Sequence, residues 1–132
     1  MAYAVPAPAR INDTDASLQY SGAWGYYPGR PASFKDLQND VHAATNDGDS
    51  LTYTFNGTGI SYVSEKSDGY GKVDVFIDSQ LQTTVDANAA GVHNQGGQVL
   101  FSAPNLTAGQ HTLKLVKRGG AYMLVDGLLV NS

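Results

Sequence analysis

The chain has 132 residues, of which 42% are hydrophobic and 15% charged, with 15 glycines, 8 tyrosines and no cysteine. A chain of this length buries roughly two thirds of its unfolded surface, which is enough for one core without covalent cross-links. The absence of cysteine excludes a disulfide scaffold, a zinc ribbon and a thiol nucleophile. The net charge of −4 disfavours nucleic acid as a partner, because few basic residues are available to contact phosphates.

The first ten residues are expected to form a linker rather than part of the fold. Pro6 and Pro8 favour extended backbone, because proline fixes its own φ and disfavours the helical region for the residue before it. We therefore predict a linker stub over 1–10 and one domain over 11–132. No apolar run approaches the roughly 18 residues of a membrane span, so no membrane partner is expected.

Apolar residues then recur with a period of two, in short runs bounded by Gly, Asn and Asp. Leu51, Tyr53 and Phe55, for example, alternate with polar residues, which is typical of half-buried strands. Eight strands are predicted in chain order: 17–20, 50–56, 60–64, 72–78, 81–86, 98–102, 111–117 and 122–130. The last run is almost continuously apolar and should lie centrally. This pattern predicts an all-β fold, an antiparallel β-sandwich of the jelly-roll type.

Two predicted connections, 21–49 and 87–97, are longer than the roughly two to five residues of an ordinary hairpin loop. The first is rich in aromatic residues and also carries Arg30. Sugar rings stack on aromatic side chains, and their hydroxyls pair with polar and charged groups. A saccharide site is therefore predicted from these loops, the glycine-flanked turn near 70 and the start of the last strand. Its candidate residues are Trp24, Tyr26, Tyr27, Asp40, His42, Lys66, Tyr70 and Tyr122.

Each of these residues also has a structural interpretation. Trp24 is the single tryptophan of a small β domain and could instead fill the core, while Tyr70 could belong to a solvated hairpin turn. Histidines in such loops are more often surface residues than ligands. These alternatives stay open at the level of the sequence.

Enzymatic motifs are incomplete. The block Gly-Asp-Ser-Leu at 48–51 resembles the opening of a lipase and esterase family, but no Asp-x-x-His follows it anywhere. A glycosidase needs two carboxyls across a cleft, and Glu65 is the only glutamate. The three histidines share no metal-binding spacing, whereas calcium held by oxygen atoms from distant strands would leave no motif. No catalytic residue is therefore assigned.

Six segments, taken in order and spacing, carry a family resemblance. They are INDTD at 11–15, YSGAW at 20–24, FNGTGI at 55–60, VDVFID at 73–78, LTAGQHTL at 106–113 and VDG at 125–127. Together they resemble the galactose-binding-domain-like β-sandwiches of secreted bacterial and fungal glycoside hydrolases, akin to carbohydrate-binding module families 6, 32 and 35.

The resemblance implies a secreted, non-catalytic module that binds an oligosaccharide or polysaccharide and targets an attached hydrolase to it, within a larger multidomain chain. It also implies a structural calcium ion near Asp13 or Asp15 and near Asp126, although the Glu-x-Glu pair of some relatives is absent. Two other functions remain open: an assembly module for protein contacts in a secreted enzyme or phage fibre, and a small hydrolase. The sequence does not indicate which sugar is bound.

Overall fold

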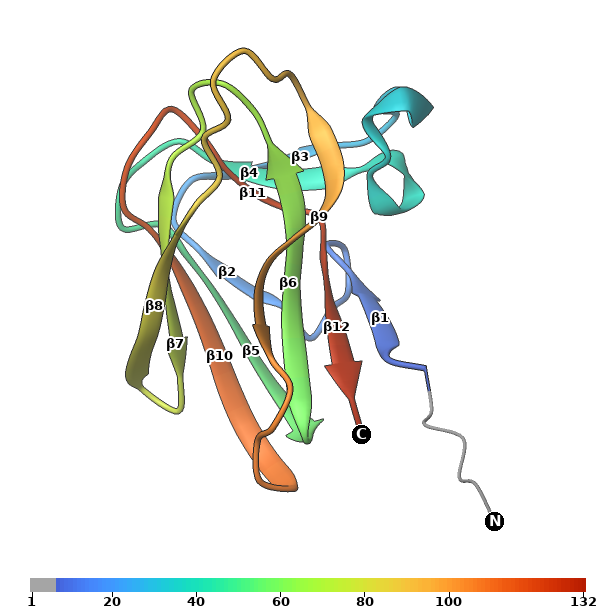
Figure 1. Ribbon diagram of the computed structural model, residues 1–132, viewed down its shortest axis with the longest axis vertical. Coiled ribbons are helices and arrows are strands. Elements are labelled where there is room, and N and C mark those ends of the chain that lie inside the picture. The colour runs from blue at the N-terminus through green and yellow to red at the C-terminus, as the bar shows by residue number, and fades with distance from the viewer. Residues whose placement is uncertain (1–6) are drawn as a thin grey trace.

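The computed structural model describes residues 7–132 and contains two large antiparallel sheets that enclose one core (Figure 1). The five-stranded sheet has the order β2 (Gln19–Ser21), β5 (Ser50–Gly57), β10 (Gly109–Lys117), β7 (Lys72–Ile77) and β8 (Gln80–Asp86). The four-stranded sheet has the order β1 (Ala9–Asn12), β12 (Gly127–Asn131), β6 (Gly59–Lys66) and β9 (Gln95–Ala103). The predicted all-β sandwich is confirmed.

A third, smaller sheet crosses the upper end of the sandwich in Figure 1. It consists of β11 (Met123–Val125), β4 (Val41–Ala44) and β3 (Trp24–Tyr27), with β4 in the middle. Two short 3-10 helices, η1 (Ala32–Phe34) and η2 (Leu37–Asn39), connect β3 to β4. This small sheet and its two helices carry most of the residues discussed below.

The core follows from the alternation in the sequence. β10 pairs with β5 on one side and β7 on the other, so the inward residues of three neighbouring strands form one surface. Leu51, Val75, Leu113 and Leu115 on this surface have no exposed area. Each buried aliphatic side chain of this kind stabilises the fold by roughly 1.5–3 kcal/mol relative to an exposed one.

The structure corrects several details of the sequence interpretation. The described residues contain twelve strands rather than eight, because short strands lie where loops were expected. Region 21–49 contains β3 and β4, and the predicted single strand 122–130 is broken at Asp126 into β11 and β12. Ala9 and Arg10, assigned to the linker, pair in β1 with β12, whereas residues 1–6 of that linker lie outside the described residues. No helix within 7–132 is long and apolar enough to cross a membrane.

Candidate functional site

The small sheet has two faces with different roles, because successive residues of a strand point to opposite sides. On one face, Tyr27 lies opposite Val41, and Ala43 lies opposite Leu124. On the other face, Trp24, Ala44, Met123 and Val125 belong to or pack against the main core. The first face forms the floor of a pocket, and the second closes the end of the sandwich.

The pocket has a volume of about 190 Å³. Its lining residues are Tyr27, Arg30, Val41, Ala43, Tyr70, Tyr122 and Leu124. Val41, Ala43 and Leu124 form a small apolar cluster of their own, against which Tyr70 packs. Tyr27 and Tyr122 remain 48% and 44% exposed, so both rings are accessible to a ligand.

Glycines allow the two chain segments that carry Tyr70 and Tyr122 to approach each other closely. Tyr70 and Tyr122 come from the β6–β7 and β10–β11 connections and form an isolated bridge, with ring centroids 6.0 Å apart in an edge-to-face arrangement. The Ala121 N–H donates a 2.8 Å hydrogen bond to the Gly69 carbonyl. A Cβ atom on Gly71 would lie 1.9 Å from the Gly119 carbonyl oxygen, so only glycine permits this approach.

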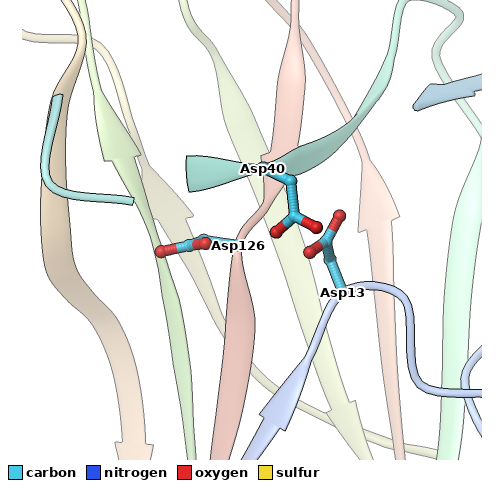
Figure 2. A group of neighbouring side chains, drawn as sticks. All are labelled: Asp13, Asp40 and Asp126. Atoms are coloured by element: carbon cyan, nitrogen blue, oxygen red, sulfur yellow. The ribbon is translucent and has the colours of Figure 1, made fainter. Parts of the chain in front are cut away.

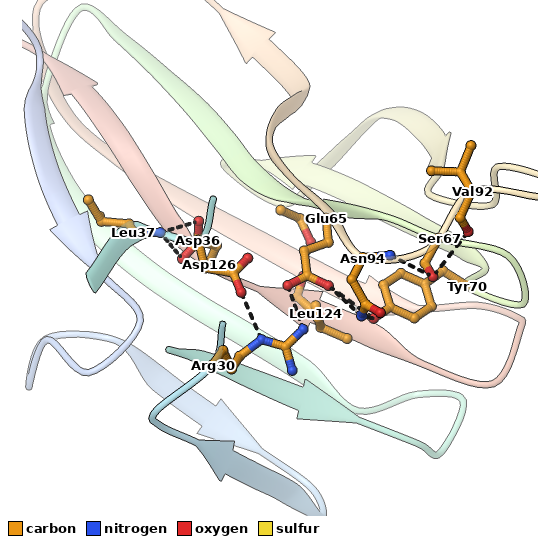
Figure 3. A network of polar contacts seen from close by, with 11 residues as sticks. Arg30, Asp36, Leu37, Glu65, Ser67, Tyr70, Val92, Asn94, Leu124 and Asp126 are labelled. Atoms are coloured by element: carbon orange, nitrogen blue, oxygen red, sulfur yellow. Dashed lines mark hydrogen bonds and ion pairs between the residues drawn. The ribbon is translucent and has the colours of Figure 1, made fainter. Parts of the chain in front are cut away.

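Two lining residues of the pocket, Arg30 and Tyr70, belong to a network of polar contacts (Figure 3). The Arg30 guanidinium donates from Nη2 to Glu65 Oε2 at 2.6 Å and from Nε to Asp36 Oδ2 at 2.7 Å. The other carboxylate oxygen, Glu65 Oε1, accepts from the Tyr70 hydroxyl at 3.2 Å and from Asn94 Nδ2 at 3.1 Å. One buried carboxylate thus holds an arginine and a tyrosine of the pocket lining.

The pKa values of the two carboxyls in this network are shifted in opposite directions. Burial, followed by a hydrogen bond with Glu65, raises the pKa of Asp36 to about 7. Burial alone would raise the pKa of Glu65 as well, but hydrogen bonds with Asp36, Asn94 and Arg30 outweigh it and hold that pKa below its ordinary value. Glu65, which bonds Arg30, is therefore the stronger acid of the two, and the side chains of both acids are inaccessible to solvent.

A second group, the acidic cluster, consists of Asp13, Asp40 and Asp126 (Figure 2). Asp13 follows β1, Asp40 precedes β4 and Asp126 separates β11 from β12. One carboxylate oxygen from each lies within 4.8 Å of the other two. Oxygen atoms that bind calcium at 2.3–2.6 Å from opposite sides are separated by a similar distance.

The acidic cluster has unused acceptors. Asn12 Oδ1, Asp13 Oδ1 and Asp40 Oδ1 are buried and have no hydrogen-bond partner. Burial, together with the neighbouring acids, raises the pKa of Asp13 to about 8 and that of Asp126 to about 6. Orphaned, desolvated oxygen atoms of this kind suit a hard cation such as calcium. The donor set therefore fits the ion implied by the family resemblance.

The predicted sugar-binding residues separate into two groups. Tyr27, Tyr70 and Tyr122 come together in the pocket. Asp40 belongs to the acidic cluster and accepts a 2.8 Å hydrogen bond from the Tyr26 hydroxyl, while His42 Nδ1 lies 2.7 Å from Asp13 Oδ2.

The two other predicted residues lie outside both groups. Trp24 is half-buried and packs against the core rather than filling it, and its Nε1 donates to the Ser21 carbonyl. Lys66 ends β6, pairs with Gln95 and does not line the pocket.

Glu65 and Asp36 were not among the sequence candidates. Glu65 is far in the sequence from two of its partners, because 35 residues separate it from Arg30 and 29 from Asn94. The one available signal was that Glu65 is the sole glutamate of the chain and directly follows a predicted strand, because a charge buried there requires a partner.

Two curated proteins of Flavonifractor plautii resemble the chain in sequence. An A type blood alpha-D-galactosamine galactosaminidase is 35% identical over 111 residues, and an A type blood N-acetyl-alpha-D-galactosamine deacetylase is 31% identical over 114 residues. The matches cover 83% and 84% of this chain, but only 10% and 14% of the two relatives. No family model matches the chain.

Solved structures decide the fold. A family 35 carbohydrate-binding module from an environmental isolate superposes with a TM-score of 0.65 at 14% identity, covering 94% of this chain and 93% of that one. The chain has the fold of a carbohydrate-binding module. The CBM36-1 domain of a multidomain xylanase from the hindgut metagenome of Trinervitermes trinervoides gives a TM-score of 0.58 at 17% identity, with coverages of 94% and 96%. A family two carbohydrate esterase from Cellvibrio japonicus gives 0.68 at 20% identity, with coverages of 94% and 33%.

Proposed function

We propose that the chain is a non-catalytic glycan-binding module, with a sugar residue held in the pocket of Tyr27, Tyr70, Tyr122 and Arg30. The observation that carries the proposal is the convergence of three tyrosines and one arginine on a concave, apolar floor. The rings offer stacking surfaces, the apolar floor accepts the C–H face of a sugar, and Arg30 offers a donor to its oxygen atoms.

The size of the pocket supports binding at a chain end. A volume of about 190 Å³ is below the roughly 300–1,000 Å³ that is typical of drug-sized ligands. One sugar ring fits such a space better than the interior of a polysaccharide. A larger cavity of about 360 Å³ lies beside η2, between Arg10 and Lys35, but none of its lining residues is aromatic.

The shape of the pocket favours a sugar over a protein partner. An assembly surface is expected to be a flat apolar patch, whereas this site is concave and combines tyrosine hydroxyls with a guanidinium group. The adjoining acids, Asp36 and Glu65, have fully buried side chains, and this burial supports binding without hydrolysis.

The sequence relatives support a galactosamine-containing ligand and a role within a larger enzyme. Both relatives are named for A type blood galactosamine derivatives, and the matching region is a small part of each. As a module of a secreted, multidomain chain, the protein would raise the local concentration of an attached catalytic domain at its glycan.

The proposal includes calcium in the acidic cluster. Asp13, Asp40 and Asp126 would supply carboxylate oxygens, and Asn12 Oδ1 is a fourth candidate ligand. Bound there, calcium would neutralise three buried acids and join β1, β4 and the β11–β12 junction.

Binding is tested by calorimetric titration with methyl glycosides of α-D-galactose, α-D-galactosamine and N-acetyl-α-D-galactosamine, alongside a glycan array. Tyr27→Ala and Tyr122→Ala are each expected to reduce binding without lowering the melting temperature. Leu81→Ala is the matched control, because Leu81 is also an exposed hydrophobic residue but lies on β8, which contributes no residue to the pocket. Undiminished binding by both tyrosine variants would rule out this pocket as the site.

A further inference from the structure

Arg30 has one guanidinium nitrogen left for a ligand. Nε is bonded to Asp36 and Nη2 to Glu65, while Nη1 makes no hydrogen bond within residues 7–132. The guanidinium is planar, so two fixed nitrogens determine where the third one points. The two buried carboxyls of Asp36 and Glu65 therefore set the direction in which the free Nη1 group of Arg30 points.

Glu65 fixes a second part of the pocket in the same way. Its Oε1 atom accepts from the Tyr70 hydroxyl and from Asn94, and Asn94 Nδ2 also lies 3.3 Å from that hydroxyl. Glu65 has no exposed area, so it cannot contact a sugar directly. It acts on the ligand only through Arg30 and Tyr70.

The same network extends to the acidic cluster (Figure 3). Asp36, which holds Arg30 Nε, is followed by Leu37, whose N–H donates to Asp126 Oδ1 at 3.0 Å and Oδ2 at 2.9 Å. The Arg30 N–H in turn donates to the Asn39 carbonyl at 2.8 Å, directly before Asp40. Segment 36–40 thus contacts Arg30 twice, contacts Asp126 through Leu37 and contains Asp40.

The backbone of segment 36–40 is expected to be stiff, so that its two ends move together. Gln38 and Asn39 have φ angles of 55°, in the left-handed region that side chains other than glycine rarely adopt. Such backbone is held in place by its surroundings and changes between discrete arrangements rather than by gradual bending. Segment 36–40 thus joins Asp126 and Asp40 to Arg30 through an unbroken series of backbone and side-chain contacts.

We infer that Glu65 is a positioning residue for the pocket and that segment 36–40 links cation binding in the acidic cluster to sugar binding at Arg30 and Tyr70. The inference rests on the proposed sugar and calcium sites. A cation at Asp126 and Asp40 fixes segment 36–40, and the segment with Glu65 fixes the free donor of Arg30. Because linkage between two binding equilibria is reciprocal, the sugar must raise calcium affinity by the same factor as calcium raises sugar affinity.

The test is calorimetric titration of the full chain with methyl N-acetyl-α-D-galactosaminide in chelator and in saturating calcium, and with calcium in the absence and presence of that glycoside. The ratio measured is the affinity for one ligand in the presence of the other divided by its affinity alone. The expected ratio is roughly 5-fold to 150-fold, and it should be the same for sugar and for calcium. Glu65→Gln should weaken sugar binding and bring the ratio close to one, while calcium affinity without sugar stays unchanged. Asp74→Asn is the control, because Asp74 pairs with Arg118 on the five-stranded sheet, and it should leave the ratio as in the wild type.

The outcomes are distinguishable. If the wild type binds both ligands but its ratio is one, the linkage is wrong and the proposed function stands. If the wild type binds neither ligand, the proposed function fails and the linkage with it. If Glu65→Gln does not fold, Arg30→Lys takes its place, because the ammonium group of lysine is a single point charge and lacks the planar fork whose remaining nitrogen is directed by Asp36 and Glu65. A wild-type ratio in that variant would overturn the inference. In the unaltered protein, the Leu37 amide resonance should shift when the sugar binds, although Leu37 does not line the pocket.

Discussion

Replacement of Asp13 by asparagine should stabilise the protein in the absence of calcium. The same substitution should remove most of the increase in melting temperature that calcium causes. In the folded, metal-free protein the pKa of Asp13 is about 8, compared with an ordinary value of 3.8, chiefly because the carboxyl is buried and then because Asp40 and Asp126 lie beside it. A carboxyl with a raised folded pKa destabilises the fold increasingly as pH rises from 3.8 to 8. At pH 7, about 3.2 pH units above the ordinary pKa of 3.8, this corresponds to a penalty on the order of 4 kcal/mol.

An asparagine side chain has nearly the same size as aspartate and stays neutral, so the substitution removes this penalty. The substitution also alters the 2.7 Å contact between Asp13 Oδ2 and His42 Nδ1, so part of the gain is offset. For a domain of this size, each kcal/mol shifts the melting temperature by roughly 4 °C. We therefore expect Asp13→Asn to melt roughly 5–15 °C above the wild type in chelator at pH 7, with the difference closing as pH falls toward 4.

Calcium should stabilise the wild type more than it stabilises Asp13→Asn. At 100 times its dissociation constant, a ligand stabilises the folded state by about 2.7 kcal/mol, or roughly 10 °C here. The wild type should show this increase and Asp13→Asn should lose most of it, because one carboxylate ligand is gone. Differential scanning calorimetry with and without calcium measures both effects.

Asp15→Asn is the matched control for this experiment. Asp15 is exposed, lies two residues from Asp13 and accepts hydrogen bonds from Ser17 rather than contacting the acidic cluster. It should leave the calcium response unchanged. A variant at position 13 that is less stable than the wild type in chelator would refute the electrostatic reasoning, and an unchanged calcium increment in that variant would refute the metal assignment.

Three further predictions concern the pocket and the fold. Gly71→Ala should lower the melting temperature and sugar binding together, since its Cβ would lie 1.9 Å from a backbone oxygen; equal stability in calorimetry would contradict this. Tyr122→Ala should weaken sugar binding roughly two- to tenfold in titration, the amount expected from about 0.5–1.5 kcal/mol of stacking, with unfolding unaffected. His111→Gln should lower the melting temperature more at about pH 5.5 than at about pH 8.5. The Thr107 carbonyl and the Asp78 carboxylate raise the pKa of His111, so the stability it adds is present below about pH 6.5 and is lost as pH rises through the raised folded pKa. A difference that is the same at both pH values would contradict that explanation.

The main strands could be predicted because their alternation is long and regular. β5, β7 and β10 are six to nine residues long, apolar residues recur at every second position within each of them, and burial follows that period. β3 and β4 have only four residues each, which is too short for a period of two to stand out from a loop. Their existence is set by pairing with each other and with β11, which is a tertiary effect.

Because β3 was not recognised as a strand, only part of the site was predicted correctly. Tyr26 and Tyr27 were assigned to one sugar site because they are adjacent in an expected loop. Adjacent residues of a strand point to opposite faces, so Tyr27 reaches the pocket and Tyr26 reaches Asp40. Tyr70 and Tyr122 were found through their glycine neighbours, which here permit the close approach of two chain segments.

The interruption at Asp126 has a consequence for the order in which the protein can fold during synthesis. β12, which follows it, lies between β1 and β6, so the last strand of the chain is internal to its sheet and the first strand pairs with it. Until residue 131 has left the ribosome, β12 cannot pair with its neighbours. The edge of β6 that faces β12 then remains exposed, and β1 has no partner strand. The acidic cluster, built from residues 13, 40 and 126, is equally incomplete until then. The proposed cation site is thus completed only at a late stage of folding, after residue 126 has emerged from the ribosome.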